Sequence, residues 1–249
     1  MSTLTYARYE TLRTLRNIRF TAFSLVFPLV LLVIVGGANR DEQNFLGTGI
    51  SFALYYLVGM ISWGAMMSVL SGGARIAPER QLGWVRQLRL TPLSPSGYLG
   101  TKVATGYLLA LLTVAVLSVV AILGLGVRMP VEGWVRMLAL VLIGLIPFAA
   151  MGVWFGHVLS SESIGPVMGG TSALFALLGG AWGPITGSSG LVHNISEFIP
   201  SYWLVQAGQS AFTGQWWPAK GWLVVGTWSV VMVFLARRSY LRDGERVAA

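Results

Sequence analysis

Long apolar runs dominate this chain. Six stretches contain few charged side chains, and each approaches the length of about 20 residues that one helical crossing of a bilayer requires. Most charged residues fall between these stretches. The pattern predicts an all-α integral membrane protein with six transmembrane helices, at residues 20–38, 50–72, 102–126, 133–159, 163–185 and 219–236.

The fifth apolar run is the least regular of the six. Glycine and proline interrupt it, beginning with Gly165, Pro166, Gly169 and Gly170. Both residue types are tolerated in membrane helices where neighbouring helices pack closely, so we retain this run as a span. An odd number of crossings remains an alternative.

The basic residues predict the orientation. Four of the 17 Lys and Arg residues lie within residues 8–19, five within 75–102 and four within 237–246. These groups share one side of the membrane if the chain crosses six times, and the excess of positive charge makes that side cytoplasmic. We therefore expect cytoplasmic N- and C-termini, with a cytoplasmic loop at 73–98, a cytoplasmic tail at 237–249 and an extracellular region at 186–218.

Composition narrows the function classes. Hydrophobic residues make up 55% of the chain and charged residues 10%, whereas a soluble domain carries about a quarter charged residues. The net charge of +8 lies in loops at one membrane face and not along a groove, which argues against a nucleic-acid partner. Cysteine is absent, and two histidines, His157 and His193, offer little for a metal site.

The sequence contains no recognisable energy source. A phosphate-binding P-loop needs Gly-Lys-Ser/Thr, but the two lysines, Lys102 and Lys220, follow Thr101 and Ala219. No predicted span carries an acid at its centre, which argues against ion coupling. Since we also find no catalytic constellation, we predict a chain that is not an enzyme, has no catalytic residues and holds no cofactor of its own. Uphill transport would then require a separate ATPase.

The loop after the second predicted span reads as one short helix. Pro78 and Glu79 suit its first turn, and Thr91-Pro92 marks its end. On a helical wheel the apolar side chains share one arc and Glu79 lies on the opposite, polar arc. The arc consists of Leu82, Trp84, Val85 and Leu88. Such a helix either rests on anionic lipid or docks into a protein groove.

The same loop resembles a family. Glu79-Arg80, Gly83, Leu88-Arg89 and the run from Thr91 to Pro95, before Lys102, resemble the loop between the second and third spans of ABC-2 type permeases. These permeases are the membrane subunits of type V ABC exporters, in which this loop is a coupling helix that inserts into a cleft of the nucleotide-binding subunit. The resemblance implies that docking involves Arg75, Glu79, Arg80, Gly83, Arg86 and Arg89.

The resemblance extends over essentially the whole chain. It makes residues 1–19 an amphipathic connecting helix at the membrane interface, and Pro28 matches a proline common in the first span. Residues 186–218 correspond to short re-entrant outer helices, with an ordinary outer loop as the alternative. Candidate outer-gate residues in that region are Glu197, Pro200 and Tyr202.

The implied function is ATP-driven export of a lipophilic substrate, such as an antibiotic, another drug or a lipid, from the cytoplasm or the inner leaflet. The implied partners are the lipid bilayer, two ATPase subunits that bind ATP and Mg, and a second permease copy in a homodimer. The implied location is a prokaryotic-type cell membrane, crossed several times. A membrane enzyme and a non-transporting partner or sensor remain alternatives. Candidate cavity residues on the second span, which equally suit helix packing, are Phe52, Tyr55, Tyr56, Met60, Trp63 and Met66.

Overall fold

The computed structural model describes residues 3–16, 18–45, 49–88, 90–185 and 190–248, and the regular elements within them are helices. The first half of the chain begins with a short helix, and a π-helical turn ends the first long apolar helix. Its elements are α1 (Thr3–Arg16), α2 (Ile18–Leu31), η1 (Leu32–Gly36), α3 (Phe52–Ala74), α4 (Ile76–Gln81), α5 (Trp84–Leu88) and α6 (Pro95–Gly124).

The second half follows the same pattern of long helices joined by short connections. Two shorter helices lie between the last two long ones. The elements are α7 (Val131–Gly144), α8 (Ile146–Val158), α9 (Ile164–Gly179), α10 (Gly190–Ser196), α11 (Pro200–Thr213) and α12 (Ala219–Ala248).

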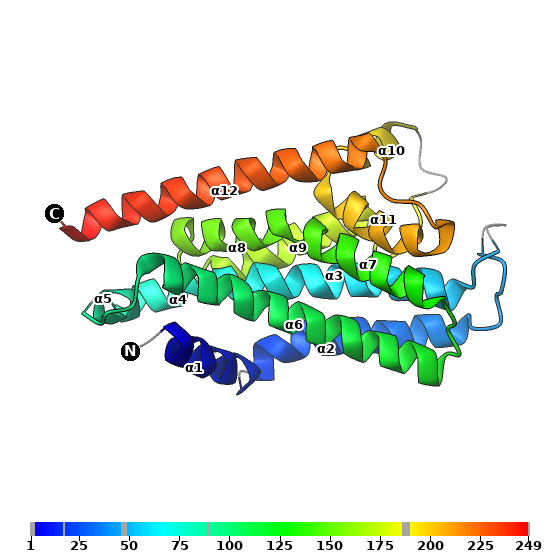
Figure 1. The fold of residues 1–249 in the computed structure, drawn as a ribbon, viewed down its shortest axis with the longest axis horizontal. Coiled ribbons are helices and arrows are strands. Elements are labelled where there is room, and N and C mark those ends of the chain that lie inside the picture. The colour runs from blue at the N-terminus through cyan, green and yellow to red at the C-terminus, as the bar shows by residue number, and fades with distance from the viewer. Residues whose placement is uncertain (1–2, 17, 46–48, 89, 186–189, 249) are drawn as a thin grey trace.

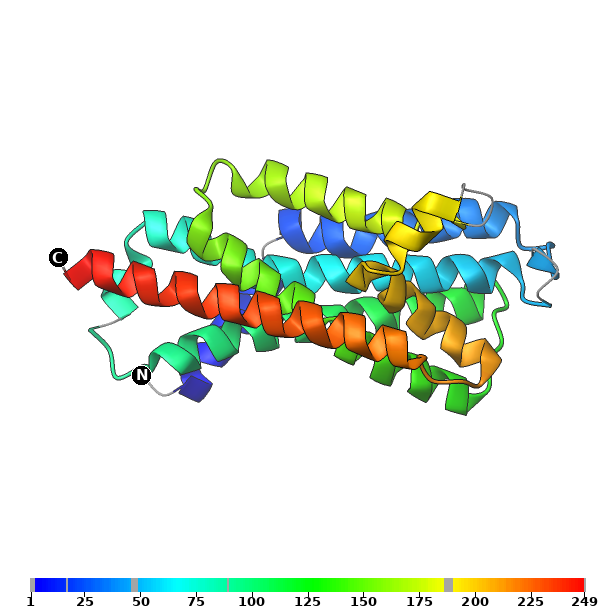
Figure 2. The ribbon, with the colours of Figure 1, turned by 90° about the horizontal axis from the view of Figure 1, so that it is seen from above.

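The long helices run lengthwise beside one another in an elongated bundle (Figure 1). Both ends of the chain lie at the same end of the bundle, together with α4 and α5, and the view from above agrees (Figure 2). Helix α10 and the connection between η1 and α3 lie at the opposite end. This arrangement agrees with the prediction that both termini share one side.

Helix α3 is the centre of the bundle. In its most apolar stretch 94% of residues are buried, against 28% for the corresponding stretch of α12. Glycines allow this close approach: a Cβ atom added at Gly72 would lie 2.7 Å from the carbonyl oxygen of Lys102 in α6, and one at Gly73 would overlap the backbone of Gly152 and Val153 in α8. Backbone-to-backbone contact through small residues is typical of packed membrane helices.

Four helical stretches in the described residues are long and apolar enough to cross a membrane: Phe52–Gln81, Pro95–Gly124, Val131–Val158 and Ala219–Asp243. Two shorter apolar helices, Ser24–Gly36 and Ile164–Gly179, correspond to the first and fifth predicted spans.

Several boundaries differ from the prediction. Helix α9 ends six residues before residue 185, because Gly180 adopts a left-handed conformation (φ 75°) and its N–H bonds to the carbonyl of Leu177. Helix α6 begins seven residues before Lys102, where Ser94 caps its N-terminus through the N–H of Gly97. The fourth predicted span is interrupted at Leu145, two residues before a proline that lacks the N–H donor.

Helix α11 packs into the bundle from the end opposite the termini. Nine of its residues are buried, including Trp203 and Leu204. The hydroxyl of Ser62 in α3 donates to the carbonyl of Leu204 over 3.1 Å, and Gly208 leaves space for Val58. The region predicted as re-entrant therefore contains a helix that is an integral part of the protein core.

Candidate functional site

The segment after α3 contains two helices where the sequence predicted one. Arg75 ends α3 and begins α4 without a break in right-handed geometry. Gly83, at φ 70°, then separates α4 from α5. A left-handed residue cannot continue an α-helix, so the chain reverses direction here. The predicted continuous helix through this position is wrong for that reason.

Glu79 lies on the buried side of α4, with 1% of its side chain exposed. Its Oε1 accepts from Lys102 Nζ at 2.6 Å and from Arg13 Nη1 at 2.8 Å, and its Oε2 accepts from the Tyr98 hydroxyl at 2.6 Å. The helical wheel placed Glu79 on a polar, exposed face. The structure places it inside, where three donors satisfy the carboxylate.

Lys102 joins this carboxylate to a second one. Its Nζ donates to Glu10 Oε1 at 2.5 Å, and 1% of its side chain is exposed. Arg75 lies 4.0 Å from the same Glu10 oxygen and also bonds to Thr14. Helices α1, α4 and α6 therefore meet at one group of charged and polar side chains, which is largely buried except for Arg13, 55% exposed. We call this group the Glu79 cluster: Glu10, Arg13, Arg75, Glu79, Tyr98 and Lys102.

Tyr6 of α1 packs beside the Glu79 cluster, with ring centroids 6.0 Å from Tyr98. Burial raises the pKa of the Tyr6 phenol well above its ordinary value, and the negative charges of Glu10 and Glu79 raise it further. The phenol therefore stays protonated and adds no charge to the cluster.

Arg80, the next residue of α4, contacts a different set of helices. Its guanidinium binds both carboxylate oxygens of Asp243 in α12, at 2.8 and 2.9 Å. It also donates to the carbonyls of Gly156 and His157 at the end of α8, at 3.2 and 2.5 Å. His157 Nδ1 lies 2.7 Å from the same carboxylate. Arg80, His157 and Asp243 form what we call the Arg80 cluster.

The turn between α4 and α5 projects from the bundle. Leu82 is 78% exposed and Trp84 is 40% exposed, whereas Leu88 is buried against Leu93 and Tyr98. Of the apolar residues predicted to share one arc, Leu82 and Trp84 are therefore exposed, whereas Leu88 holds the segment against the bundle. We call Leu82, Gly83 and Trp84 the tip. The side chains of Arg86 and Arg89, both predicted docking residues, lie outside the described residues.

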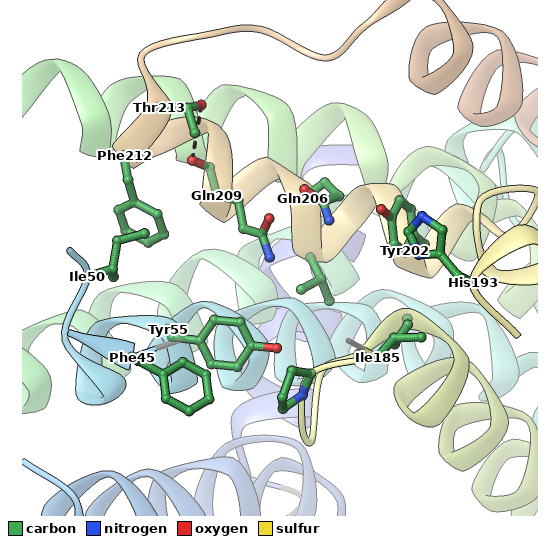
Figure 3. Close-up of a pocket in the computed structure, with 14 residues that line it drawn as sticks. Phe45, Ile50, Tyr55, Ile185, His193, Tyr202, Gln206, Gln209, Phe212 and Thr213 are labelled. Atoms are coloured by element: carbon green, nitrogen blue, oxygen red, sulfur yellow. Dashed lines mark hydrogen bonds between the residues drawn. The ribbon is translucent and has the colours of Figure 1, made fainter. Parts of the chain in front are cut away.

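The predicted cavity residues on α3 are packed inside the chain's own bundle. Tyr56, Met60, Trp63 and Met66 are each at most 5% exposed, and Phe52 is partly buried against the same core. Tyr55 lines a cavity. That cavity lies between α3 and α11 (Figure 3).

The predicted gate residues lie near that cavity at the far end of the bundle. Glu197 pairs with Lys220, the second residue of α12, and lies 3.6 Å from His193. The hydrogen bond from Lys220 lowers the pKa of the Glu197 carboxyl below its ordinary value. Pro200 is buried at the first turn of α11, and Tyr202 lines the cavity.

Comparison with known proteins identifies the family. The profile of a family described as "ABC-2 family transporter protein" matches residues 39–238, from the end of the first apolar helix into α12. The chain belongs to the ABC-2 transporter family. It is also 26% identical over 197 residues to a Bacillus subtilis (strain 168) protein named "Putative transport permease YvfS", with 78% of each chain covered. The predicted resemblance is confirmed, and the chain is a membrane-embedded ABC-2 permease, the transport subunit of a class that associates with an ATPase.

The sequence did not predict the ion pairs that Glu10 and Asp243 form within this ABC-2 permease. Glu10 is the single acid among residues 1–19, and Asp243 lies in a tail rich in arginine. An isolated acid in a basic segment was the available signal, but Lys102 lies 92 residues from Glu10, and His157 and Arg80 lie 86 and 163 residues from Asp243. Lys102 was predicted as the first residue of the third span and counted with the cytoplasmic basic residues; the structure places it seven residues after the start of α6, where it is buried.

Proposed function

We propose that this permease is the membrane subunit of an ATP-driven exporter and that the ATPase subunit docks on the tip. The observation that carries the proposal is that two adjacent residues of α4 are bonded to two different pairs of helices. Glu79 is held by α1 and α6, and Arg80 by α8 and α12. Between these anchors and the tip, α4 forms a short rigid arm.

This geometry supports transmission of force from the tip into the spans. Helix α4 follows α3 through Arg75 without an intervening loop, and α3 packs closely on α6 and α8. A displacement of Leu82 or Trp84 would therefore pull on all three helices together. Since Glu79, Arg75 and Arg80 bond within their own chain, we assign them to holding the arm. We therefore assign contact with the ATPase to the tip, which includes Gly83, and to Arg86 and Arg89.

We further propose six crossings with both termini in the cytoplasm. The two shorter apolar helices, Ser24–Gly36 and Ile164–Gly179, run beside the four longer candidates (Figure 1). The basic tail at 237–246 and the tip share the end of the bundle that carries the termini, as the positive-inside rule requires. In this topology α1 lies at the inner interface, and α10 and α11 enter from the outer side.

The distribution of buried polar groups supports a lipophilic, uncharged substrate. The buried charged residues described, Glu10, Glu79 and Lys102, gather at the inner end, and the buried polar residues along α3 are serines. An anionic or cationic substrate would find no compensating charge at that depth. A path along α3 past Met60 and Trp63 would require α3 to separate from its neighbours, as an ATP-driven rearrangement could bring about. Antibiotics, other drugs and lipids fit this description.

The proposed assembly contains two permease copies, as a homodimer, and two ATPase subunits that bind ATP and Mg, in a prokaryotic-type cell membrane. Helix α9 supports a second copy: Gly165, Gly169 and Gly170 each leave open space where a Cβ would stand. Exposed small residues allow another helix to approach closely.

The test is ATP-dependent transport in inverted vesicles. The permease would be co-expressed with a candidate ABC ATPase subunit, and accumulation of lipophilic antibiotics and fluorescent lipids would be measured with and without ATP. Export predicts ATP-dependent accumulation and stimulation of ATP hydrolysis by the transported compound. A matched ATPase carrying a P-loop lysine substitution should abolish both. Purification of the permease without any ATPase, or accumulation that persists with the inactive ATPase, would contradict the proposal.

A further inference from the structure

A cavity of about 510 Å³ lies between α11 and the beginning of α3, at the end of the bundle opposite the termini. Its remaining wall comes from the segment that follows α9, including Pro184 and Ile185 (Figure 3). The volume falls in the range of about 300–1,000 Å³ that small-molecule sites occupy. Its lining does not include Met60 or Trp63, the residues of α3 named for the substrate path.

One wall of the cavity is a polar stripe on α11. Tyr202, Gln206, Gln209 and Thr213 line it, and their spacing of three or four residues places them on one face of the helix. Figure 3 shows Gln206 and Gln209 projecting from α11 toward the space above α3. Both side chains are half-buried. The Gln209 amide makes no hydrogen bond to any other residue that the structure describes.

The opposite wall is aromatic and aliphatic. Phe45, Ile50 and Tyr55 face α11 across the cavity, and the rings of Phe45 and Tyr55 lie 5.0 Å apart. Phe212 of α11 closes the end next to Ile50 (Figure 3). Flat aromatic side chains offer a large apolar contact area that does not depend on charge.

The charge of the lining restricts the ligand. The residues described around the cavity include no Asp, Glu, Lys or Arg, and the histidine among them, His193, lies with its Nε2 3.6 Å from the carboxylate of Glu197. A charged ligand would lose hydration here without gaining an ion pair. A carboxamide such as that of Gln209 both donates and accepts hydrogen bonds, so it matches a hydroxyl or amide group.

We infer that this cavity is a binding site for an uncharged amphipathic small molecule, with an aromatic or aliphatic body against Phe45 and Tyr55 and a hydroxyl or amide group against Gln206 and Gln209. Its assignment to the outer face rests on the topology proposed above. The site would receive a molecule on the outer side, and so lies apart from any path along the inner half of α3.

Three photoreactive probes with one aromatic body test the inference. They are 4-(hydroxymethyl)benzophenone, which is neutral, 4-benzoylbenzoic acid, which is anionic, and 4-(aminomethyl)benzophenone, which is cationic. The full chain in lipid nanodiscs would be irradiated with each, and labelled peptides would be quantified by mass spectrometry. Labelling would be normalised to the exposed apolar face of α12 around Val230 and Phe234, which corrects for partitioning into lipid.

The matched variants are Gln209→Leu in the cavity and Gln215→Leu on an exposed loop outside it. The inference predicts that the neutral probe labels α11 and residues 45–55 above both charged probes. Gln209→Leu should lower this labelling about fivefold, the effect of one lost neutral hydrogen bond, and Gln215→Leu should leave it unchanged. Equal labelling by all three probes, or equal labelling of the two variants, would overturn the inference. Since the assay uses neither ATP nor ATPase, its outcome is independent of the transport test.

Discussion

Lys102 of α6 donates to Glu79 of α4 across 2.6 Å, with 1% of either side chain exposed. The same ammonium reaches Glu10 of α1, so one cation joins three helices at the end of the bundle that carries the termini. Taking charges out of water is costly unless partners compensate them, and here each carboxylate has at least one buried or partly buried cation. The position of α4, and hence of the tip, is fixed by this arrangement.

Replacing Lys102 with Met should destabilise the permease strongly. Two buried carboxylates would lose their shared cation, which costs about 3–5 kcal/mol when one partner of a buried pair is removed. The control is Lys220→Met, because Lys220 pairs with Glu197 at an exposed position where a pair contributes at most about 1 kcal/mol. Thermal unfolding in detergent measures both variants. Equal shifts in Tm would contradict the structural role of the Glu79 cluster.

Asp243→Asn should release the end of α12 from α4. The guanidinium of Arg80 would lose its charged partner, and hydrogen bonds to charged groups contribute about 1.5–3 kcal/mol. Hydrogen exchange within residues 237–248 should therefore become faster. Arg242→Gln, an exposed neighbour on the same helix, is the control and should leave the exchange rates unchanged. Unaltered exchange in Asp243→Asn would show that the Arg80 cluster does not hold α12.

Gly73→Ala should lower stability, because the added methyl group would overlap the backbone of Gly152 and Val153. Overpacking of this kind costs about 1–3 kcal/mol or more. At Gly100, on the exposed side of α6, a Cβ meets nothing within 4 Å. Gly100→Ala should raise stability by up to about 1 kcal/mol through helix propensity. Chemical denaturation of the two variants would show shifts of opposite sign, and shifts of the same sign would argue against close packing of α3 on α8.

The contact between Glu197 and Lys220 should depend on pH. Lys220 lowers the pKa of Glu197 below its ordinary value of 4.5, so the pair stabilises the fold above that value. The stabilisation is lost as the pH falls through the lowered pKa. The chain has no cysteine, so Val192→Cys gives a single site on α10. Its rate of labelling by a methanethiosulfonate, divided by the rate for free cysteine at the same pH to correct for the loss of thiolate, should be higher at pH 3.5 than at pH 6, and the additional change Glu197→Gln should abolish that increase.

Hydropathy and charge asymmetry predicted the approximate helix positions, because those properties depend on composition along the chain. The ends of α9 and α4 were missed, since Gly180 and Gly83 stop helices through a left-handed conformation that many other glycines do not adopt. The two clusters were missed for another reason. In the sequence, Glu79 lies in a basic loop and Lys102 at the start of a predicted span beside that loop, and only the fold brings α1, α6 and α8 around α4.

The roles of the predicted docking residues could not be derived from the sequence either. The sequence directed the docking prediction to residues 75–89, but it did not distinguish side chains that hold the segment, such as Glu79 and Arg80, from those that face outward, such as Leu82. That distinction requires knowing which helices surround α4. Contact of the outward residues with an ATPase stays a prediction.

Site-specific cross-linking from the tip tests the central claim most directly. Leu82→Cys in this cysteine-free chain would carry a maleimide–diazirine reagent, and the permease would be irradiated in membranes that contain its ATPase. A permease–ATPase product is expected from residue 82. None is expected from a matched single cysteine at Thr213, on the opposite end of the bundle. Absence of the product at residue 82 in a complex that co-purifies and hydrolyses ATP, or equal yields from both positions, would contradict docking at the tip.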